Sequence, residues 1–232
     1  MKKAGVCAAG IFLIIIILGA AVLQPDRQSV QSWSAAGVQH QLILDAGHGG
    51  EDGGAVSLSG VPESQINLAI VQKMDGILGL FGRPAILLRN EDRSLHDDTA
   101  VTLREKKVSD LKNRVDAVNR INNATLISIH QNSFPEQKYR GTQVFYANTD
   151  GSQELAAYIQ NAIRQTIQPD NSREEKKITD QVYLMNNIQC RGVLVECGFL
   201  TNPEEEALLR SQEYQKKLAA VLTAACITTT EV

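Results

Sequence analysis

The sequence predicts an α/β protein: a single three-layer domain with a mostly parallel, twisted β-sheet and helices on both faces, preceded by an N-terminal hydrophobic export helix. Two observations lead to this fold class. From Gln41 onward, short β-type apolar runs alternate with longer segments whose apolar residues recur at helical spacing. The chain has 232 residues, 43% of them hydrophobic, which is enough for one good core and favours one domain over two.

The β-type runs are short, apolar and bounded by turn-forming residues. The expected strands are Gln41–Asp45, Ala85–Leu88, Leu126–Ile129, Thr142–Tyr146, Val182–Met185 and Gly192–Glu196. Because helices separate most of them, a mostly parallel sheet is expected.

The helical segments show apolar residues three and four positions apart. They cover Gln65–Phe81, Lys107–Ile121, Glu154–Ile167 and, in two pieces, the region from Pro203 to about Ile227. Gly82-Arg-Pro84 ends the first of them. Before the last, Asn202 is a polar cap and Glu204-Glu-Glu206 places acids near the positive end of the helix dipole.

The amino end predicts export. Lys2-Lys3 precede an uncharged stretch from Ala4 to Leu23, and about 20 apolar residues can cross a bilayer, whereas a signal-peptide core has about 7–15. The lysines would direct everything after Leu23 outward. Small residues at Gly19-Ala-Ala21 allow cleavage, so residues 1–23 are a signal peptide or a membrane anchor. Residues 24–40 lack periodicity and are expected to be a linker, which leaves 41–228 as the catalytic domain.

Composition excludes some partners and scaffolds. A net charge of -3 and 5% aromatic residues give neither the basic surface nor the stacking platform of a nucleic-acid-binding protein. Cys7 lies in the export segment, and strand alternation would place Cys190 and Cys197 on opposite faces. With no C-x-x-C pair, the cysteines are expected to be buried free thiols, Cys226 included.

Two histidines follow β-type runs where those runs break into turn-forming residues. His48 and His130 would therefore lie at the carboxyl ends of strands, where α/β sheets bind ligands, and could share one divalent metal. Glu63 is a candidate third ligand, and Glu196, which interrupts an apolar run, is a candidate general base because a buried carboxylate needs a partner or a function. The pattern predicts a metallohydrolase.

Histidine at a strand end and glutamate at a helix start also have simpler interpretations. A histidine at a strand end is often only a hydrogen-bonding residue, and His40 and His96 fit that description. Glu63 follows Pro62 and could simply favour a helix start. His48 differs because the glycines around it allow close backbone approach to a bound group.

Four motifs in order resemble the zinc-dependent N-acetylmuramoyl-L-alanine amidases, the "amidase 3" catalytic domain, over residues 41 to about 228. They are Leu44-Asp-Ala-Gly-His48-Gly-Gly, Glu63-Ser-Gln-Ile-Asn-Leu, Ser128-Ile-His130-Gln-Asn132-Ser and Val193-Leu-Val-Glu196-Cys-Gly-Phe. The resemblance implies zinc at His48, Glu63 and His130, catalysis by Glu196, and a substrate-binding role for Asn132. The family often has Glu-Lys-Asp where this chain has Glu63-Ser-Gln65, which leaves the ligand position intact.

This ligand set implies a mechanism. Two imidazoles and one carboxylate leave zinc an open position for water, whose pKa the metal lowers to about 7. Glu196 would take the water proton and pass it to the leaving amine. The resemblance implies that the bond cut joins the lactyl group of N-acetylmuramic acid to L-alanine in peptidoglycan.

The spare layout, an export segment and linker before a bare catalytic domain, further resembles the germination-specific spore-cortex members of the family. That implies a location in the spore intermembrane or cortex space, formation of muramic-δ-lactam, and a functional partnership with a muramic acid deacetylase. The alternatives are a general cell-wall amidase, a zinc deacetylase or peptidase, and a non-catalytic wall-binding protein. Release of a peptide with a free amino-terminal alanine separates the amidase from the others.

Overall fold

A computed structural model describes residues 40–230. The export helix expected at residues 1–23 and nearly all of the linker expected at residues 24–40 lie outside the described residues. Within the part that is described, no helix combines the length and the apolar character needed to cross a membrane.

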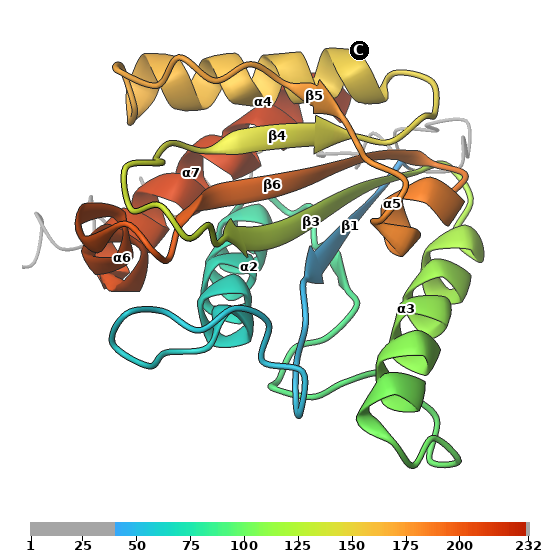
Figure 1. The fold of residues 1–232 in the computed structure, drawn as a ribbon. Helices are drawn as coiled ribbons and strands as arrows, with labels where there is room; N and C mark the ends of the chain where they lie inside the picture. Colours follow the sequence, from blue (N-terminus) through green and yellow to red (C-terminus); the bar gives the residue numbers. More distant parts are fainter. Residues whose placement is uncertain (1–39, 231–232) are drawn as a thin grey trace, which may run out of the picture. The chain divides into compact units, whose positions relative to one another are not determined.

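A six-stranded, mostly parallel sheet forms the middle layer (Figure 1), as the sequence predicts. Its strands are β1 (Gln41–Ala46), β2 (Ile86–Leu87), β3 (Ala124–Asn132), β4 (Gln143–Tyr146), β5 (Lys176–Lys177) and β6 (Arg191–Phe199). They lie in the order β2-β1-β3-β6-β4-β5, and only the β4–β6 pair is antiparallel. The carboxyl ends of β1, β3 and β6 therefore meet at one edge of the sheet.

Helices cover both faces of the sheet (Figure 1), which confirms the three-layer expectation. Their bounds are α2 (Glu63–Leu80), α3 (Leu103–Asn119), α4 (Ser152–Thr166), α5 (Tyr183–Asn187), α6 (Pro203–Arg210) and α7 (Gln212–Thr230). Along β3, Ile127 and Ile129 belong to the apolar cluster beneath α2, α4 and α7, whereas Leu126 belongs to the cluster beneath α3 and α5. Alternate side chains of β3 therefore pack into the two apolar clusters on opposite faces of the sheet.

The expected strand at Val182–Met185 is wrong, because residues 183–185 belong to the short helix α5 and Val182 is its N-cap. The neighbours Leu184 and Met185 are both buried in one apolar cluster, which a helical turn allows and an alternating strand does not. The two-residue strand β5 consists of two exposed lysines, so the sequence has no apolar pattern from which this strand could be predicted. Helix α3 starts earlier than expected, at Leu103, because a capping box fixes its first turn.

The carboxyl-terminal region forms two helices, as expected. Asn202 caps α6 by accepting hydrogen bonds from the backbone N–H groups of Glu204 and Glu205. Cys190, Cys197 and Cys226 are free thiols, and the last two are fully buried.

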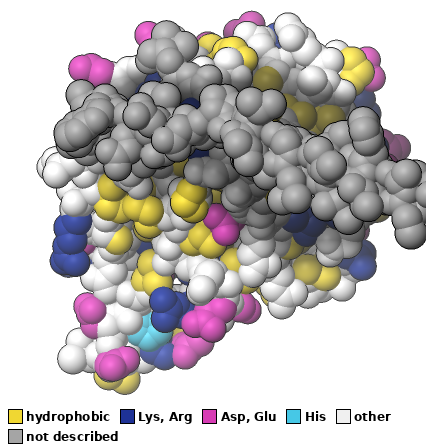
Figure 2. All heavy atoms as spheres, turned by 180° about the vertical axis from the view of Figure 1, so that it is seen from behind, with side chains coloured by type: hydrophobic (Ala, Val, Ile, Leu, Met, Phe, Trp, Pro, Cys, Tyr) yellow, Lys and Arg dark blue, Asp and Glu magenta, His cyan; other side chains and the backbone are white. Residues whose placement is uncertain are grey.

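Apolar side chains also reach the surface. Figure 2 shows the face opposite to that of Figure 1, and on its visible described part apolar side chains lie in small groups among charged and polar ones. The most exposed large ones include Leu80 at the end of α2 and Val101 just before α3. Such scattered residues are normal for a folded domain and do not mark a site.

Candidate metal centre

The backbone that carries His48 is held by two buried arginines. Arg89 donates from Nε to the carbonyl of Ala46 (2.7 Å) and from Nη2 to that of Gly47 (3.0 Å). Arg114 donates from Nη1 to the carbonyl of Ala46 (3.1 Å) and from Nη2 to that of His48 (2.8 Å). His48 has a positive φ of 62°, which is uncommon for a residue with a side chain. These bonds stabilise that conformation just beyond the end of β1.

The charge of Arg114 is balanced inside the protein. Its guanidinium forms ion pairs with Asp45 and with Asp110, the latter at 2.7 Å from Nε. Asp45 is fully buried and also accepts a hydrogen bond from Ser128 Oγ (2.6 Å). Burial alone would raise the pKa of Asp45, but Arg114 and Ser128 together hold that pKa below its usual value. Asp45 and Arg114 therefore form a buried, ionised pair next to the backbone of residues 46–48.

The ring of His48 is oriented by a residue that the sequence reasoning did not single out. Asp52 Oδ2 lies 2.9 Å from His48 Nδ1, while His48 Nε2 lies 3.4 Å from Glu63 Oε2. The hydrogen bond from His48 holds the pKa of Asp52 well below its usual value. With Nδ1 directed at Asp52, Nε2 is the ring nitrogen that faces Glu63. The i+4 spacing in the glycine-rich loop was the only signal for Asp52.

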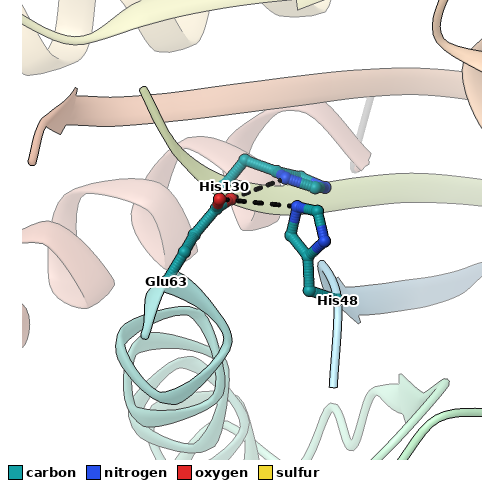
Figure 3. Close-up of side chains that lie close together, drawn as sticks. All are labelled: His48, Glu63 and His130. Carbon is teal, nitrogen blue, oxygen red and sulfur yellow. Dashed lines mark hydrogen bonds and ion pairs between the residues drawn. The ribbon is translucent and has the colours of Figure 1, made fainter. Parts of the chain in front are cut away.

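Glu63 is the first residue of α2, and its carboxylate is buried. It accepts backbone hydrogen bonds from Ala55 (3.0 Å, Oε2) and Gln131 (3.1 Å, Oε1), and His130 Nδ1 lies 2.9 Å from Oε1. Burial raises the pKa of Glu63, but the hydrogen bond and charge of His130 and the charge of His48 outweigh it and lower the pKa to about 2. Glu63 is thus an anion aimed between two imidazoles (Figure 3).

The three side chains pack closely enough for one ion. One ligand atom from each of His48, Glu63 and His130 lies within 4.8 Å of the others, and the two rings meet edge-on with centroids 5.0 Å apart. Glycine is required beside them: a Cβ at Gly47 would lie 2.1 Å from His130 Nε2, and one at Gly54 would lie 2.6 Å from Glu63 Oε2. The expected ligands therefore converge in a cradle that larger residues would close.

The donor set fits zinc. Two imidazole nitrogens and a carboxylate oxygen are ligands that zinc takes, at about 2.0–2.2 Å, and two such ligands of one tetrahedral ion lie about 3.4 Å apart. The 3.4 Å between His48 Nε2 and Glu63 Oε2 agrees with that separation. Through the hydrogen bond between its Nδ1 and Asp52, His48 also has the carboxylate partner usual for a metal-bound histidine.

Glu196 lies beside this cluster. It stands opposite His130 in the register of β6 against β3, and its Oε2 atom is buried without a hydrogen-bond partner in the part of the chain that the structure describes. Burial, together with the negative charge of Glu63, raises the pKa of Glu196 to about 7, against the lowering effect of the histidines. A carboxyl group in this state can take up and release a proton near neutral pH.

The remaining candidates lie apart from this cluster or lack a clear contact to it. Asn132 ends β3 opposite Phe199, two residues beyond His130. The rings of His40 and His96 make ordinary hydrogen bonds, to Thr125 Oγ1 (2.9 Å) and Ser94 Oγ (2.9 Å) respectively, as their simpler reading predicted.

Comparison with known proteins extends the likeness to the whole domain. The profile of a family described as N-acetylmuramoyl-L-alanine amidase (Amidase_3) matches residues 42–228. The germination-specific N-acetylmuramoyl-L-alanine amidase of Bacillus subtilis is 35% identical over 196 residues, which cover 84% of this chain and 81% of that relative.

Solved structures give the same picture. The CwlD amidase of Clostridioides difficile, solved in complex with the GerS lipoprotein, aligns with a TM-score of 0.77 and 37% identity, covering 83% of this chain and 98% of that one. An N-acetylmuramoyl-L-alanine amidase from Clostridium difficile 630 aligns with a TM-score of 0.71 and 26% identity, covering 83% and 97% of the two chains.

Proposed function

The chain belongs to the N-acetylmuramoyl-L-alanine amidase family, and we propose that it cuts peptidoglycan with one zinc ion held by His48, Glu63 and His130 and with Glu196 as the general base. One observation carries the proposal. Three ligand side chains from separate segments converge beside a buried carboxylate oxygen that has no hydrogen-bond partner among the described residues.

Each residue has a distinct task in this chemistry. When bound, zinc supplies a Lewis acid that polarises the scissile carbonyl and lowers the pKa of water. Asp52 keeps the Nε2 atom of His48 directed at the centre, and Ala55 and Gln131 fix the carboxylate of Glu63. Glu196 takes a proton from the attacking water and delivers it to the nitrogen of L-alanine as that amine leaves.

The direct test is mass spectrometry of muropeptides after incubation with the purified exported chain and zinc. We expect a released peptide with a free amino-terminal alanine. Release of acetate, or of a shortened peptide, would instead indicate another zinc hydrolase.

The metal assignment has its own test. In His48→Ala and in His130→Ala, elemental analysis should show loss of stoichiometric zinc, because each variant leaves only two protein ligands. Full retention of zinc in both variants would rule out the site.

We propose that the substrate is spore cortex. The 35% identical relative is named for germination, and the alignment covers 84% of this chain and 81% of that relative. Removal of stem peptides would prepare muramic acids for a partner deacetylase, which completes the muramic-δ-lactam. A deletion strain should therefore make cortex that lacks this lactam, and spores with a normal lactam content would contradict the cortex role.

Export and partnership belong to the same proposal. Residues 1–23 would carry the domain across the membrane, as a cleaved signal or as an anchor. The C. difficile relative was solved with a lipoprotein, and we propose that this chain also binds an exported protein. Affinity purification from sporulating cells tests this, and recovery of the chain alone at stoichiometric zinc and full activity would contradict it.

A further inference from the structure

We propose that a cavity lined by Lys138, Arg140 and Arg173 binds a carboxylate of the stem peptide, two or three residues beyond the bond that is cut. The inference rests on the proposed function, because it concerns the part of the substrate that extends away from the metal centre. The cavity has a volume of about 480 Å³ and is also lined by Ile167 after α4, Glu205 of α6 and Tyr214 of α7.

A row of side chains on the face of the sheet covered by α3 leads from the metal centre to Arg173, one of the residues that line this cavity. His130 on β3 stands opposite Glu196 on β6, and Glu196 stands opposite Gln143 on β4, so the three side chains share one face of the sheet. Gln143 Oε1 in turn accepts a hydrogen bond from Arg173 Nη1 (2.8 Å). Arg173 therefore follows Gln143 as the second polar side chain beyond the proposed base.

The length of this row fits a short peptide. Neighbouring strands lie about 4.8 Å apart, so Gln143 is about 10 Å from His130. An extended peptide covers about 3.3–3.6 Å per residue, so its second or third residue after the scissile amide reaches this distance. The acidic groups of a stem peptide occur at these residues.

The chain connection supports the same geometry. The segment from β3 to β4, residues 133–142, begins three residues after His130, ends just before Gln143, and carries Lys138 and Arg140. It runs beside α6 (Figure 1), where Glu205 Oε1 accepts the backbone N–H of Gly141 (2.8 Å). Lys138 and Arg140 are thus tied at one end to β3, which carries His130, and at the other to β4, which pairs with the strand of Glu196.

The cationic side chains of the cavity have N–H donors that are not used in hydrogen bonds to other described residues. Arg173 uses Nε on the carbonyl of Arg140 (2.8 Å) and Nη1 on Gln143, and within the described residues its Nη2 has no partner. Within the part of the chain that the structure describes, the guanidinium of Arg140 forms one ion pair, a long one of 3.9 Å to the exposed Glu204, and Glu205 acts on it only through its charge. The Lys138 ammonium lies 5.3 Å from the centre of the Tyr139 ring and forms no ion pair with another described residue.

Three acidic residues, Asp170, Glu204 and Glu205, line the cavity beside the three cations, so an anion site there depends on which cations are left unpaired and not on net charge. Asp170 forms no ion pair with another described residue. Both oxygens of Glu205 are already used, by the backbone N–H groups of Gly141 (2.8 Å) and Phe199 (2.8 Å). Glu204 is 84% exposed and extends into solvent. What remains available is a pair of guanidinium groups, the side chain that best matches a planar carboxylate.

The test compares substrates and variants together. The purified exported chain with zinc is given glycan-linked tripeptides whose carboxyl groups are free, or amidated at the second or at the third residue. The wild type should prefer the free acid at one of these positions. Arg140→Gln should lower kcat/KM for that free acid roughly 10- to 100-fold, the effect of one charged hydrogen bond, and leave kcat/KM for the matching amide unchanged.

Arg210→Gln is the matched control. Arg210 is a part-exposed arginine of α6 that pairs with Glu206 (3.3 Å) and does not line the cavity, so this variant should keep the wild-type preference. If Arg140→Gln lowers kcat/KM equally for the free acid and the amide, or for neither, the carboxylate site is wrong, although the proposed amidase chemistry is not affected. A wild type that cuts none of the tripeptides would overturn the proposed chemistry, and the subsite with it.

Discussion

Replacing Glu196 by glutamine should inactivate the enzyme and at the same time stabilise its zinc-free fold. Glutamine keeps the size and shape of the side chain but cannot accept a proton, and a general base contributes about 10²–10⁴-fold to the rate. The expected stabilisation of the zinc-free fold follows from the surroundings of Glu196. Glu196 Oε2 is buried without a hydrogen-bond partner among the described residues, so the ionised form is poorly solvated in the folded protein.

The size of the stability effect follows from the pKa of Glu196. Burial raises it from 4.5 to about 7, which corresponds to about 3 kcal/mol in favour of the protonated form. Between these two values the folded protein binds more protons than the unfolded chain, so the wild type loses stability as the pH rises. Glu196→Gln lacks this loss. Its advantage should be near zero below pH 4.5 and reach about 3 kcal/mol above pH 7.

Urea unfolding with a chelator present, at several pH values from 4 to 8, measures this difference. Glu205→Gln is the control, because both carboxylate oxygens of Glu205 accept backbone N–H groups and an amide nitrogen cannot. That variant should lose stability at neutral pH. A Glu196→Gln protein that is active, or that is less stable than the wild type at pH 8, would refute the assignment of Glu196 as an unpaired, buried base.

Three further outcomes are expected. Asp52→Ala should weaken zinc binding about 10- to 100-fold in a chelator competition, because His48 loses its orienting partner; an unchanged affinity would contradict that role. Arg114→Met should cost about 3–5 kcal/mol of unfolding free energy at pH 7, since it leaves Asp45 buried and unpaired. Because the pKa of Asp45 is lowered, the ion pair stabilises the wild type above about pH 4, and this contribution is lost as the pH falls further. The difference in unfolding free energy between the wild type and Arg114→Met should therefore shrink in acid. A difference that does not change with pH would argue against the pair. A reporter fused after Val232 should be active only outside the cytoplasm, and cytoplasmic activity alone would contradict export.

Much of the fold could be predicted because its strands and helices carry strong periodic signals. The segments around Ile43 and Leu126 are short apolar runs, and α4 has a clear apolar face. The signal failed where an element is too short to show a period. At Val182–Met185 four residues fit a strand or a helix equally, and packing against the sheet selected the helix.

The ligands and the base could be named from the sequence because histidine and glutamate stand out where a strand ends. The groups that hold them could not. Asp52, Arg89 and Arg114 look like ordinary surface charges along the chain, yet both arginines are almost completely buried. Their role depends on which carbonyls lie nearby in space, and only the folded backbone of residues 46–48 determines that.

The apolar core also determines the catalytic geometry. On β6, Leu194 and Val195 are both buried, in different clusters on the two faces of the sheet. A slip of β6 by one residue would turn each side chain toward the other core, where it would not fit the space, and such misfits in a packed core cost typically about 1–3 kcal/mol each. The same slip would move Glu196 away from His130. The burial that stabilises the sheet therefore also holds the proposed base beside the metal ligand, so large-to-small changes in this core should lower activity even where they touch no catalytic residue.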